Sequence, residues 1–390
     1  MTQENLLAEN PQSTVNASHQ KKVHVIAFDL PYPPDYGGAT DIYHKVRSLH
    51  ELGMEVILHI FLYRGKKPAA ELESITSETH YYFRKTWVNP FWGKQPYVVS
   101  TRKSKKLLER LLQDNHPILF EGLHTTAYLT HPQLANRNKV VRAHNVEHHY
   151  YRALGDAELR TWKKQFFYLE AKRLERYEKV LTHANAIAAI SPMETNYFQK
   201  TYGKTHYIPA FHSNGDVVSK TGKGEYVLYH GNLGIPENDR AARYLAEYVF
   251  PKLSIPCIIA GSKPSSALQD AVNQSNNILL EANLSAEKIF QRVQDAHVNV
   301  LVTFQSTGIK LKLLNSLYRG RFIVANTPMV DETQLESLCF IGDSPNFIAQ
   351  QIDHLLNQDF TEKDIEARKS MLSQTFNNHH NAQLLSALLQ

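Results

Sequence analysis

A stripe of polar residues runs along a helix that the sequence predicts in the last quarter of the chain. Lys310 and Lys312 follow a Gln-Ser-Thr-Gly turn, and spacings of three and four residues place Gly308, Lys312, Asn315 and Arg319 on one helical face. Two cations at a helix N-terminus oppose the helix dipole, so a bound anion would relieve that conflict. The stripe therefore predicts an anion site, although a solvated polar face has the same pattern.

A pair of glycines follows the first predicted strand. Gly37 and Gly38 lie between an apolar strand at 22–30 and a helix at 41–54. Glycines without a Cβ, next to helix amides that point outward, offer a docking place for an anion. The pattern is not the G-x-G-x-x-G dinucleotide fingerprint, so a simple turn is the alternative interpretation.

Histidines gather at the end of another predicted strand. In "VRAHNVEHHYYRAL", His144 ends the strand, and His148 and His149 follow four and five residues later. Ligands of parallel α/β sheets bind at the carboxyl ends of strands, so His144 is a candidate site residue. The order of His and Glu does not match a H-E-x-x-H zinc motif and no cysteine is near, so hydrogen-bonding histidines are the preferred interpretation.

A carboxylate and a histidine end the neighbouring predicted strand. Glu121 and His124 in "FEGLHTT" have the residue types of a general base or a hydroxyl-binding pair. Two loop residues that only hydrogen-bond each other would give the same pattern.

The chain contains no D-x-D spacing, the simplest signal for a metal ion clamped to a diphosphate. We therefore expect Lys, Arg and helix amides to neutralise phosphate charge, with no metal or other cofactor.

These residues need a scaffold, and the apolar segments predict two parallel sheets. Apolar strands alternate with amphipathic helices in both halves of the chain. The predicted fold class is α/β, with two Rossmann-like, doubly wound domains that face each other across a cleft. The predicted parts are a polar, disordered tail (1–21), a first domain (22–208) completed by a C-terminal helix (about 372–390), a Pro-, Gly- and Ser-rich linker (209–224) and a second domain (225–371).

Composition limits the class of protein. The chain has 390 residues, of which 42% are hydrophobic, enough for two cores. Cys257 and Cys339 lie far apart in apolar surroundings, a pattern typical of a reduced, cytoplasmic protein. The net charge of +5 is mixed with 38 acidic residues, which argues against nucleic-acid binding and suits an anionic ligand or a membrane surface. No window is apolar enough to span a membrane.

Basic and aromatic residues alternate on a long predicted helix at 159–181, and a basic turn occurs at 100–112. This combination suits a peripheral contact with the inner face of a membrane. A charged face in solvent above a buried aromatic face is the alternative interpretation.

Four motifs resemble, in this order, those of bacterial glycosyltransferase family 4 proteins: "PYPPDYGGA", "RAHNVEHHYYRAL", "YHGNLGIPENDRAARYL" and "TGIKLKLLNSLYRGRFIVAN". The resemblance covers 22–390 and is to a mannosyltransferase-like branch of the Bacteroidetes type. It implies the GT-B fold, with a nucleotide-sugar donor held mainly by the second domain and a glycan or lipid-linked acceptor by the first. It also implies a retaining, metal-independent transfer of a hexose-type sugar in the synthesis of a cell-surface polysaccharide or glycoconjugate.

The resemblance implies roles for individual residues as well. Gly37 and Gly38 would lie near the donor phosphates, His144 would contact the donor sugar, and Lys310 and Lys312 would face the diphosphate. His144 and Lys312 are therefore the expected catalytic residues. The other expected donor contacts are Gly231, Asn232, Thr307, Gly308, Ile309 and Asn315, and the expected acceptor-side residues are Glu121 and His124.

The chain departs from the family pattern at two places. Thr307 and Asn315 replace a pair of glutamates that contact the donor sugar and the ribose, although Asn315 can still hydrogen-bond a ribose hydroxyl. Asn232 stands where the family has an arginine, and Glu237 and Asn238 stand near the position of a lysine. The leading hypothesis is an active glycosyltransferase. The alternatives are a non-catalytic GT-B nucleotide-sugar-binding or partner protein, and a GT-B-shaped sugar-nucleotide epimerase, which the order of the motifs fits poorly.

Overall fold

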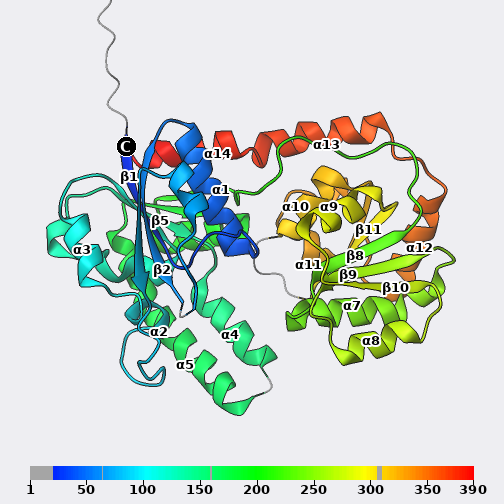
Figure 1. Cartoon of the computed structure of the whole chain (residues 1–390), viewed down its shortest axis with the longest axis horizontal. Coiled ribbons are helices and arrows are strands. Elements are labelled where there is room, and N and C mark those ends of the chain that lie inside the picture. The colour runs from blue at the N-terminus through cyan, green and yellow to red at the C-terminus, as the bar shows by residue number, and fades with distance from the viewer. Residues whose placement is uncertain (1–20, 64, 159, 305–309) are drawn as a thin grey trace, which may run out of the picture.

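Two parallel β-sheets organise the chain, one in each half. The computed structural model describes residues 21–390 apart from 64, 159 and 305–309. Each sheet carries its own helices, and the two lobes lie side by side (Figure 1). The tail predicted at 1–21 lies, except for its last residue, outside the described residues.

The first sheet has seven parallel strands in the order β3-β2-β1-β4-β5-β6-β7. Its central strands are buried almost throughout, because a parallel sheet covered on both faces leaves neither face to solvent. The strands are β1 (Lys22–Ala27), β2 (Glu55–Leu62), β3 (Glu78–Phe83), β4 (Ile118–Glu121), β5 (Lys139–Ala143), β6 (Ala186–Ala189) and β7 (Thr205–Tyr207).

Alternate residues of β1 enter two different cores. Val23 and Val25 pack in a core that includes Ile42 of α1, while Ile26 packs in a core that includes Leu107 of α3. The α-helices of this half are α1 (Gly37–Glu51), α2 (Tyr97–Ser100), α3 (Lys105–Leu111), α4 (Glu147–Ala157), α5 (Thr161–Tyr177) and α6 (Pro192–Tyr202). The 3₁₀ helices are η1 (Ala70–Ile75), η2 (Leu123–Tyr128), η3 (Pro132–Leu134) and η4 (Glu178–His183).

The second sheet has six parallel strands in the order β10-β9-β8-β11-β12-β13. The strands are β8 (Val227–Asn232), β9 (Cys257–Ser262), β10 (Ile278–Ala282), β11 (Val298–Leu301), β12 (Phe322–Ala325) and β13 (Phe340–Ile341). The helices around it are α7 (Pro236–Tyr248), η5 (Phe250–Lys252), α8 (Ser266–Asn273), α9 (Ala286–Asp295), α10 (Leu311–Arg319), α11 (Thr327–Val330), η6 (Glu336–Leu338) and α12 (Pro345–Leu356).

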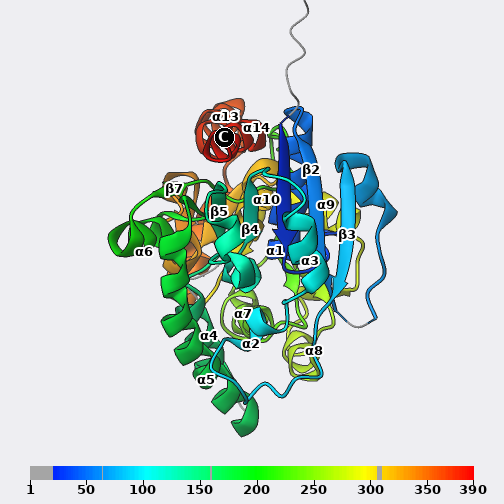
Figure 2. The same cartoon turned by 90° about the vertical axis from the view of Figure 1, so that its left-hand side faces the viewer.

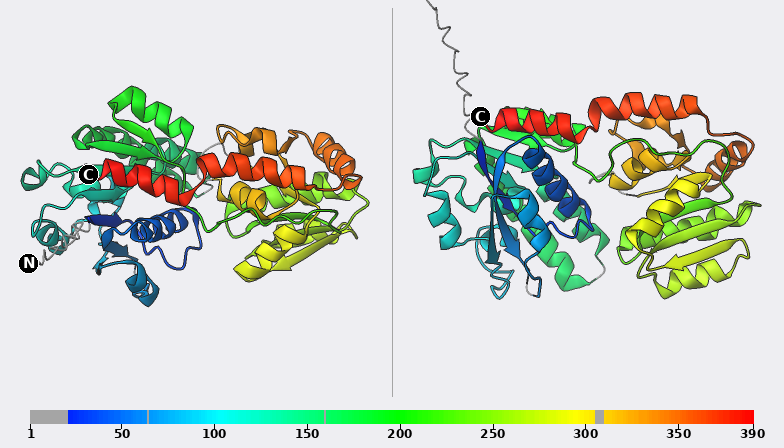
Figure 3. Two further views of the ribbon diagram at one scale, coloured as in Figure 1. Left: turned by 90° about the horizontal axis from the view of Figure 1, so that it is seen from above. Right: turned by 45° about the horizontal axis from the view of Figure 1, so that its top comes forward.

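The last two helices join the lobes. α13 (Glu362–Thr375) runs along the second lobe and α14 (Asn378–Leu388) returns to the first, as the view from above shows (Figure 3). Ala382 and Leu385 of α14 belong to the same core as α1. The C-terminal segment therefore contributes to the core of the first domain.

Helix boundaries differ from the sequence prediction in two places. The long helix predicted at 159–181 is α5 followed by η4, and α4 packs against it as an unpredicted partner. The helical pattern at the C-terminus is broken between α13 and α14, where the Asn377 side chain caps α14.

Within the described part of the chain, none of the helices is both long and apolar enough to cross a membrane.

Candidate active site

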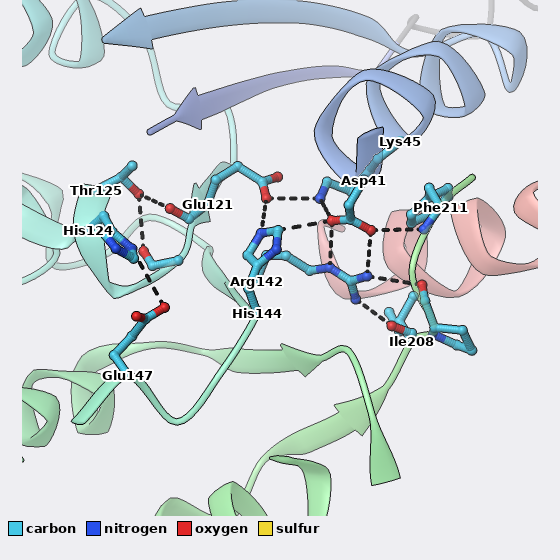
Figure 4. Close-up of polar contacts among 12 residues, drawn as sticks. Asp41, Lys45, Glu121, His124, Thr125, Arg142, His144, Glu147, Ile208 and Phe211 are labelled. Carbon is cyan, nitrogen blue, oxygen red and sulfur yellow. Dashed lines mark hydrogen bonds and ion pairs between the residues drawn. The ribbon is translucent and has the colours of Figure 1, made fainter. Parts of the chain in front are cut away.

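Five buried charged or polar side chains meet at the carboxyl edge of the first sheet (Figure 4). Lys45 Nζ lies 2.7 Å from Asp41 Oδ2 and 2.9 Å from Glu121 Oε2. His144 Nε2 lies 3.0 Å from the same Glu121 oxygen, and Arg142 Nη2 donates to Asp41 Oδ1 at 2.9 Å. We refer to Asp41, Lys45, Glu121, Arg142 and His144 as the buried ionic cluster.

The parallel register brings these side chains together. Glu121 is the last residue of β4 and pairs with Arg142 on β5, and His144 directly follows β5. Asp41 and Lys45 lie one turn apart on α1, the helix that follows β1. Glu121 and His144, which the sequence places at the ends of two strands, are therefore in contact.

The cluster also holds the start of the linker. Arg142 donates to the backbone oxygen of Ile208, and the Phe211 N–H donates to Asp41 Oδ1 at 2.8 Å. Burial alone would raise the pKa of Asp41, but the positive charges of Arg142 and Lys45 outweigh it and hold that pKa well below its usual range. Ionised Asp41 thus ties α1, β5 and the linker to one another.

Three members of the cluster have the residue types of a metal site. One ligand atom each from Asp41, Glu121 and His144 lie within 4.8 Å of one another. Lys45 donates to both carboxylates, so its ammonium group stands where a metal ion would need to bind. These residues do not fit a divalent ion unless Lys45 moves away.

A second group of polar atoms lies next to the cluster. Phe28, just after β1, packs between two histidines, with its ring centre 5.3 Å from that of His124 and 5.4 Å from that of His144. His124 Nδ1 lies 3.7 Å from Oε1 of Glu147, the first residue of α4. Among the described residues, no hydrogen bond reaches Glu121 Oε1, His124 Nδ1 or His144 Nδ1. Buried polar atoms are usually paired, so this group suits a ligand rich in hydroxyl groups.

Glu147 makes stability depend on pH. Burial raises its pKa to about 8, whereas a glutamate in an unfolded chain has a pKa of about 4.3. Between these values the folded state keeps a proton that the unfolded state releases, so the free energy of unfolding falls as pH rises through this range. Glu147→Gln should remove this loss, which urea unfolding at about pH 5 and about pH 8 would measure. The exposed Glu247→Gln is the control. Equal pH slopes for wild type and Glu147→Gln would contradict the prediction.

The second domain places a lysine at the carboxyl end of β8. Lys312 Nζ donates to Asn238 Oδ1 at 2.7 Å and lies 5.2 Å from the centre of the Tyr229 ring. A Cβ on Gly231 would lie 3.3 Å from Asn238 Cγ and 3.4 Å from Lys312 Nζ, so glycine leaves the approach to the ammonium group open. Burial lowers the pKa of Lys312 to about 8, although Glu237 acts in the opposite direction. A partly buried cation beside a glycine and the start of α7 is suited to hold a phosphate group.

Lys310 lies between the two domains. Together with 190–194 at the start of α6 and 331–333 after α11, it lines a cavity of about 100 Å³. Burial lowers its pKa to about 8, against the opposing effect of Glu237 and Glu194. The two lysines predicted to act together thus face different surroundings: Lys312 contacts the loop after β8, and Lys310 faces the first domain.

Glycines and Asn232 shape the loops around both halves of the site. Gly37 and Gly38 open α1, and a Cβ on Gly38 would lie 2.8 Å from Phe28 Cζ, too close to fit without moving that ring. Asn232 Oδ1 accepts hydrogen bonds from Gly234 N–H and from Ser262 Oγ, both at 3.1 Å. Asn232 therefore fixes the turn after β8.

The far end of the polar stripe contacts the linker. Asn315 Oδ1 accepts a hydrogen bond from Asn214 Nδ2 at 2.8 Å, and Arg319 Nε donates to Asn214 Oδ1 at 3.1 Å. The stripe on α10 thus contacts the β8 loop through Lys312 and the linker through Asn315 and Arg319. The remaining predicted donor residues, Thr307, Gly308 and Ile309, lie outside the described residues.

The sequence prediction omitted several residues of this site. Arg142 stands in an apolar strand, a signal that a buried carboxylate must compensate it. Asp41 and Lys45 lie four apart on the helix that follows the glycine pair, a spacing that permits an ion pair. Glu147 offered no comparable signal.

Comparisons with known proteins bear on this architecture. No protein-family model matches the chain. An uncharacterized 44.6 kDa protein in the cps region of Klebsiella pneumoniae is 26% identical over 330 residues, which are 78% of this chain and 83% of that protein. Among solved structures, TarM matches with a TM-score of 0.65 and 10% identity over 96% of this chain and 100% of that chain. A glycosyltransferase from Rickettsia africae matches with a TM-score of 0.63 and 12% identity over 95% of this chain and 98% of that one.

The fold is GT-B. An Escherichia coli protein solved with UDP-2-fluoro glucose also matches, with a TM-score of 0.59 and 11% identity over 95% of this chain and 99% of that chain. The GT-B expectation is thus confirmed, with the two parallel-sheet domains that it requires. In this GT-B chain the buried ionic cluster belongs to the first domain and Lys312 to the second.

Proposed function

We propose that the protein is a glycosyltransferase that binds a nucleotide-sugar donor on its second domain and a glycan or lipid-linked acceptor on its first. The observation that carries the proposal is the partly buried Lys312 ammonium at the carboxyl end of β8, beside Gly231 and Asn238. Strand ends of this kind are where α/β sheets bind ligands. The finer proposal is a retaining, metal-independent transfer of a hexose-type sugar by a family 4 enzyme of the mannosyltransferase-like branch.

Lys312 and Lys310 would neutralise the diphosphate as it leaves the sugar, and the leaving phosphate would help to deprotonate the acceptor. His144, held by Glu121 at 3.0 Å, would line the donor-sugar side of the first domain. His124, whose Nδ1 receives no hydrogen bond from the described residues, and the neighbouring Glu147 would bind acceptor hydroxyls. Lys45 already balances Glu121 and Asp41, which supports a mechanism without a metal ion.

The biological setting is also part of the proposal. The relative from a cps region supports a role in making a cell-surface polysaccharide or glycoconjugate. Both cysteines are unpaired, which supports a cytoplasmic location. Peripheral contact with the inner face of the membrane would bring the enzyme to a lipid-linked acceptor.

A non-catalytic GT-B nucleotide-sugar-binding or partner protein is the second candidate. It is favoured by Asn315, which stands where the family pattern has a ribose-binding glutamate and here accepts a hydrogen bond from Asn214 of the linker. A panel of UDP-, GDP- and dTDP-sugars would separate the candidates, read by thermal shift and by slow donor hydrolysis. Binding with turnover supports the enzyme, binding without turnover supports the partner protein, and no response to any nucleotide overturns the enzyme.

Donor affinity should depend on pH. Burial lowers the pKa of both Lys310 and Lys312 to about 8, and a bound diphosphate would raise it again. Proton uptake then accompanies binding, so affinity is highest below pH 8 and should fall about tenfold or more from pH 7 to pH 9. Titration calorimetry with the preferred nucleoside diphosphate, in two buffers of different ionisation enthalpy, measures both quantities. An affinity that is the same at pH 7 and pH 9, with no proton uptake, would contradict the assignment of Lys310 and Lys312 to the diphosphate.

A further inference from the structure

The three tryptophans of the chain are all strongly exposed. Trp87 is 83% exposed, Trp92 77% and Trp162 59%, although tryptophan is normally among the more buried residues. Together with Phe83, they are the most exposed large apolar side chains of the described part of the chain. Exposed aromatic side chains that gather in one place mark an interaction surface.

The structure brings together the two segments that carry these side chains. Trp87 and Trp92 lie in the loop between β3 and α2, and Arg173 of α5 donates to the backbone oxygen of Phe91 in that loop at 2.7 Å. The Phe91 ring lies 6.1 Å from that of Phe166. Trp162 lies one turn before Phe166 on α5, and the loop passes beside that helix (Figure 2). We call Trp87, Phe91, Trp92 and Trp162 the aromatic surface.

Positive charge surrounds the aromatic surface without any negative charge in the same segments. From 84 to 108 the chain has seven basic residues and no Asp or Glu, and from 160 to 169 it has three basic residues and again no acid. Lys85 and Lys94 flank the two loop tryptophans and are exposed. The basic residues are Arg84, Lys85, Lys94, Arg102, Lys103, Lys105, Lys106, Arg160, Lys163 and Lys164.

We propose that the aromatic surface docks on an anionic lipid bilayer. Tryptophan rings favour the boundary between lipid headgroups and acyl chains, and lysines are attracted to anionic headgroups. The combination of exposed Trp with an excess of cations over anions fits that boundary better than the evenly mixed charges of a protein partner. The sequence predicted membrane contact by the basic, aromatic helix at 159–181. The aromatic surface adds the loop before α2, which lies at its centre.

Docking would hold the acceptor side of the first domain close to the membrane. Arg102, which directly follows α2, donates through Nε to the backbone oxygen of Phe28 at 2.9 Å. Phe28 packs between His124 and His144. The loop after β3 and the polar atoms near β4 and β5 also share one edge, because all these strands are parallel. This step rests on the proposed function. A first domain docked on a bilayer in this way would take a lipid-linked acceptor.

The tryptophans themselves report the contact. Intact protein is mixed with vesicles of phosphatidylcholine containing about 30% phosphatidylglycerol, and with vesicles of phosphatidylcholine alone. We expect a blue shift of tryptophan fluorescence with the anionic vesicles, quenching by lipids brominated on the acyl chain, and weaker binding at high salt. No shift and no quenching with anionic vesicles would overturn the proposal, because every tryptophan lies on the proposed surface.

Variants tie the binding to this surface. In vesicle co-sedimentation, the double variant Trp87→Ala/Trp92→Ala and the double variant Lys85→Glu/Lys94→Glu should each bind about tenfold more weakly or worse. Matched controls are Tyr248→Ala, an aromatic residue 53% exposed on α7, and Lys288→Glu, an exposed lysine on α9. Vesicle binding equal to wild type in both double variants would place the contact elsewhere.

A separate readout keeps this proposal distinct from the proposed function. Donor binding and slow donor hydrolysis take place without a membrane, so both double variants should retain them. Vesicle binding without any donor response would leave the surface intact and overturn the glycosyltransferase. Donor turnover without vesicle binding would support the glycosyltransferase and overturn the membrane-docking surface.

Discussion

Lys312→Ala is expected to weaken binding of a nucleoside diphosphate or its sugar ester by about ten- to a hundredfold, because a charge-assisted hydrogen bond contributes about 1.5–3 kcal/mol. The lysine is partly buried, and its hydrogen-bond partner among the described residues is the neutral Asn238 Oδ1, so none of their carboxylates competes with a phosphate for a hydrogen bond from it. Catalysis should fall further, since charge grows on the diphosphate as the bond to the sugar breaks. Titration calorimetry measures the first effect and donor hydrolysis the second.

Lys288→Ala is the matched control for this variant. It removes an exposed lysine from α9 of the same domain and should leave both readouts unchanged. Thermal unfolding of each variant shows whether the fold persists. If Lys312→Ala folds and binds the nucleotide as tightly as wild type, the diphosphate does not bind at the end of β8, and the proposed donor site is wrong.

The sequence predicted the sheets of this protein well because of how parallel sheets are buried. Strands such as β2 and β9 are apolar almost throughout, and each is flanked by an amphipathic helix, so their pattern is distinct from solvent-exposed segments. From parallel strands it follows that their carboxyl ends meet at one edge. This reasoning placed Glu121 and His144 at neighbouring strand ends, where they are in contact.

The partners of the polar residues could not be predicted in the same way. Asn315 was predicted to contact ribose, a role that stays a prediction, and the structure adds a hydrogen bond to Asn214 that depends on the path of the linker. No local periodicity encodes where a Pro- and Gly-rich segment runs. Similarly, the exposure of Trp87 and Trp92 depends on how the loop after β3 is held by Arg173 of α5.

Sequence motifs did not predict that Asp41 is part of the site. Its spacing to Lys45 also fits an ordinary surface pair, and the same helix contains such a pair in Arg47 and Glu51. Which of the two pairs is buried depends on how α1 packs against β4 and β5. The structure gives Asp41 and Lys45 no exposed side-chain area, while Arg47 and Glu51 are about half exposed.

That contrast gives the prediction with the largest effect on stability. Asp41→Ala leaves Lys45 and Arg142 buried without their shared carboxylate, and breaking a buried ion pair in this way costs about 3–5 kcal/mol. The melting temperature should fall by about 10 °C, given about 2–4 °C per kcal/mol in a domain of this size. Glu51→Ala breaks an exposed pair on the same helix and should change the free energy of unfolding by less than about 0.5 kcal/mol.

A second substitution separates charge from hydrogen bonding. Asp41→Asn keeps an oxygen that can accept the Phe211 N–H but removes the negative charge between Lys45 and Arg142. If charge dominates, Asp41→Asn should lose most of the stability that Asp41→Ala loses. Because the pKa of Asp41 is held below its usual range, the stabilisation is present above an ordinary aspartate pKa of about 3.9 and is lost only as pH falls further. At neutral pH, an Asp41→Ala variant no less stable than Glu51→Ala would show that the cluster does not support the first domain. The apolar core that α1, α14 and the start of the linker share would then have to hold α1 against the linker.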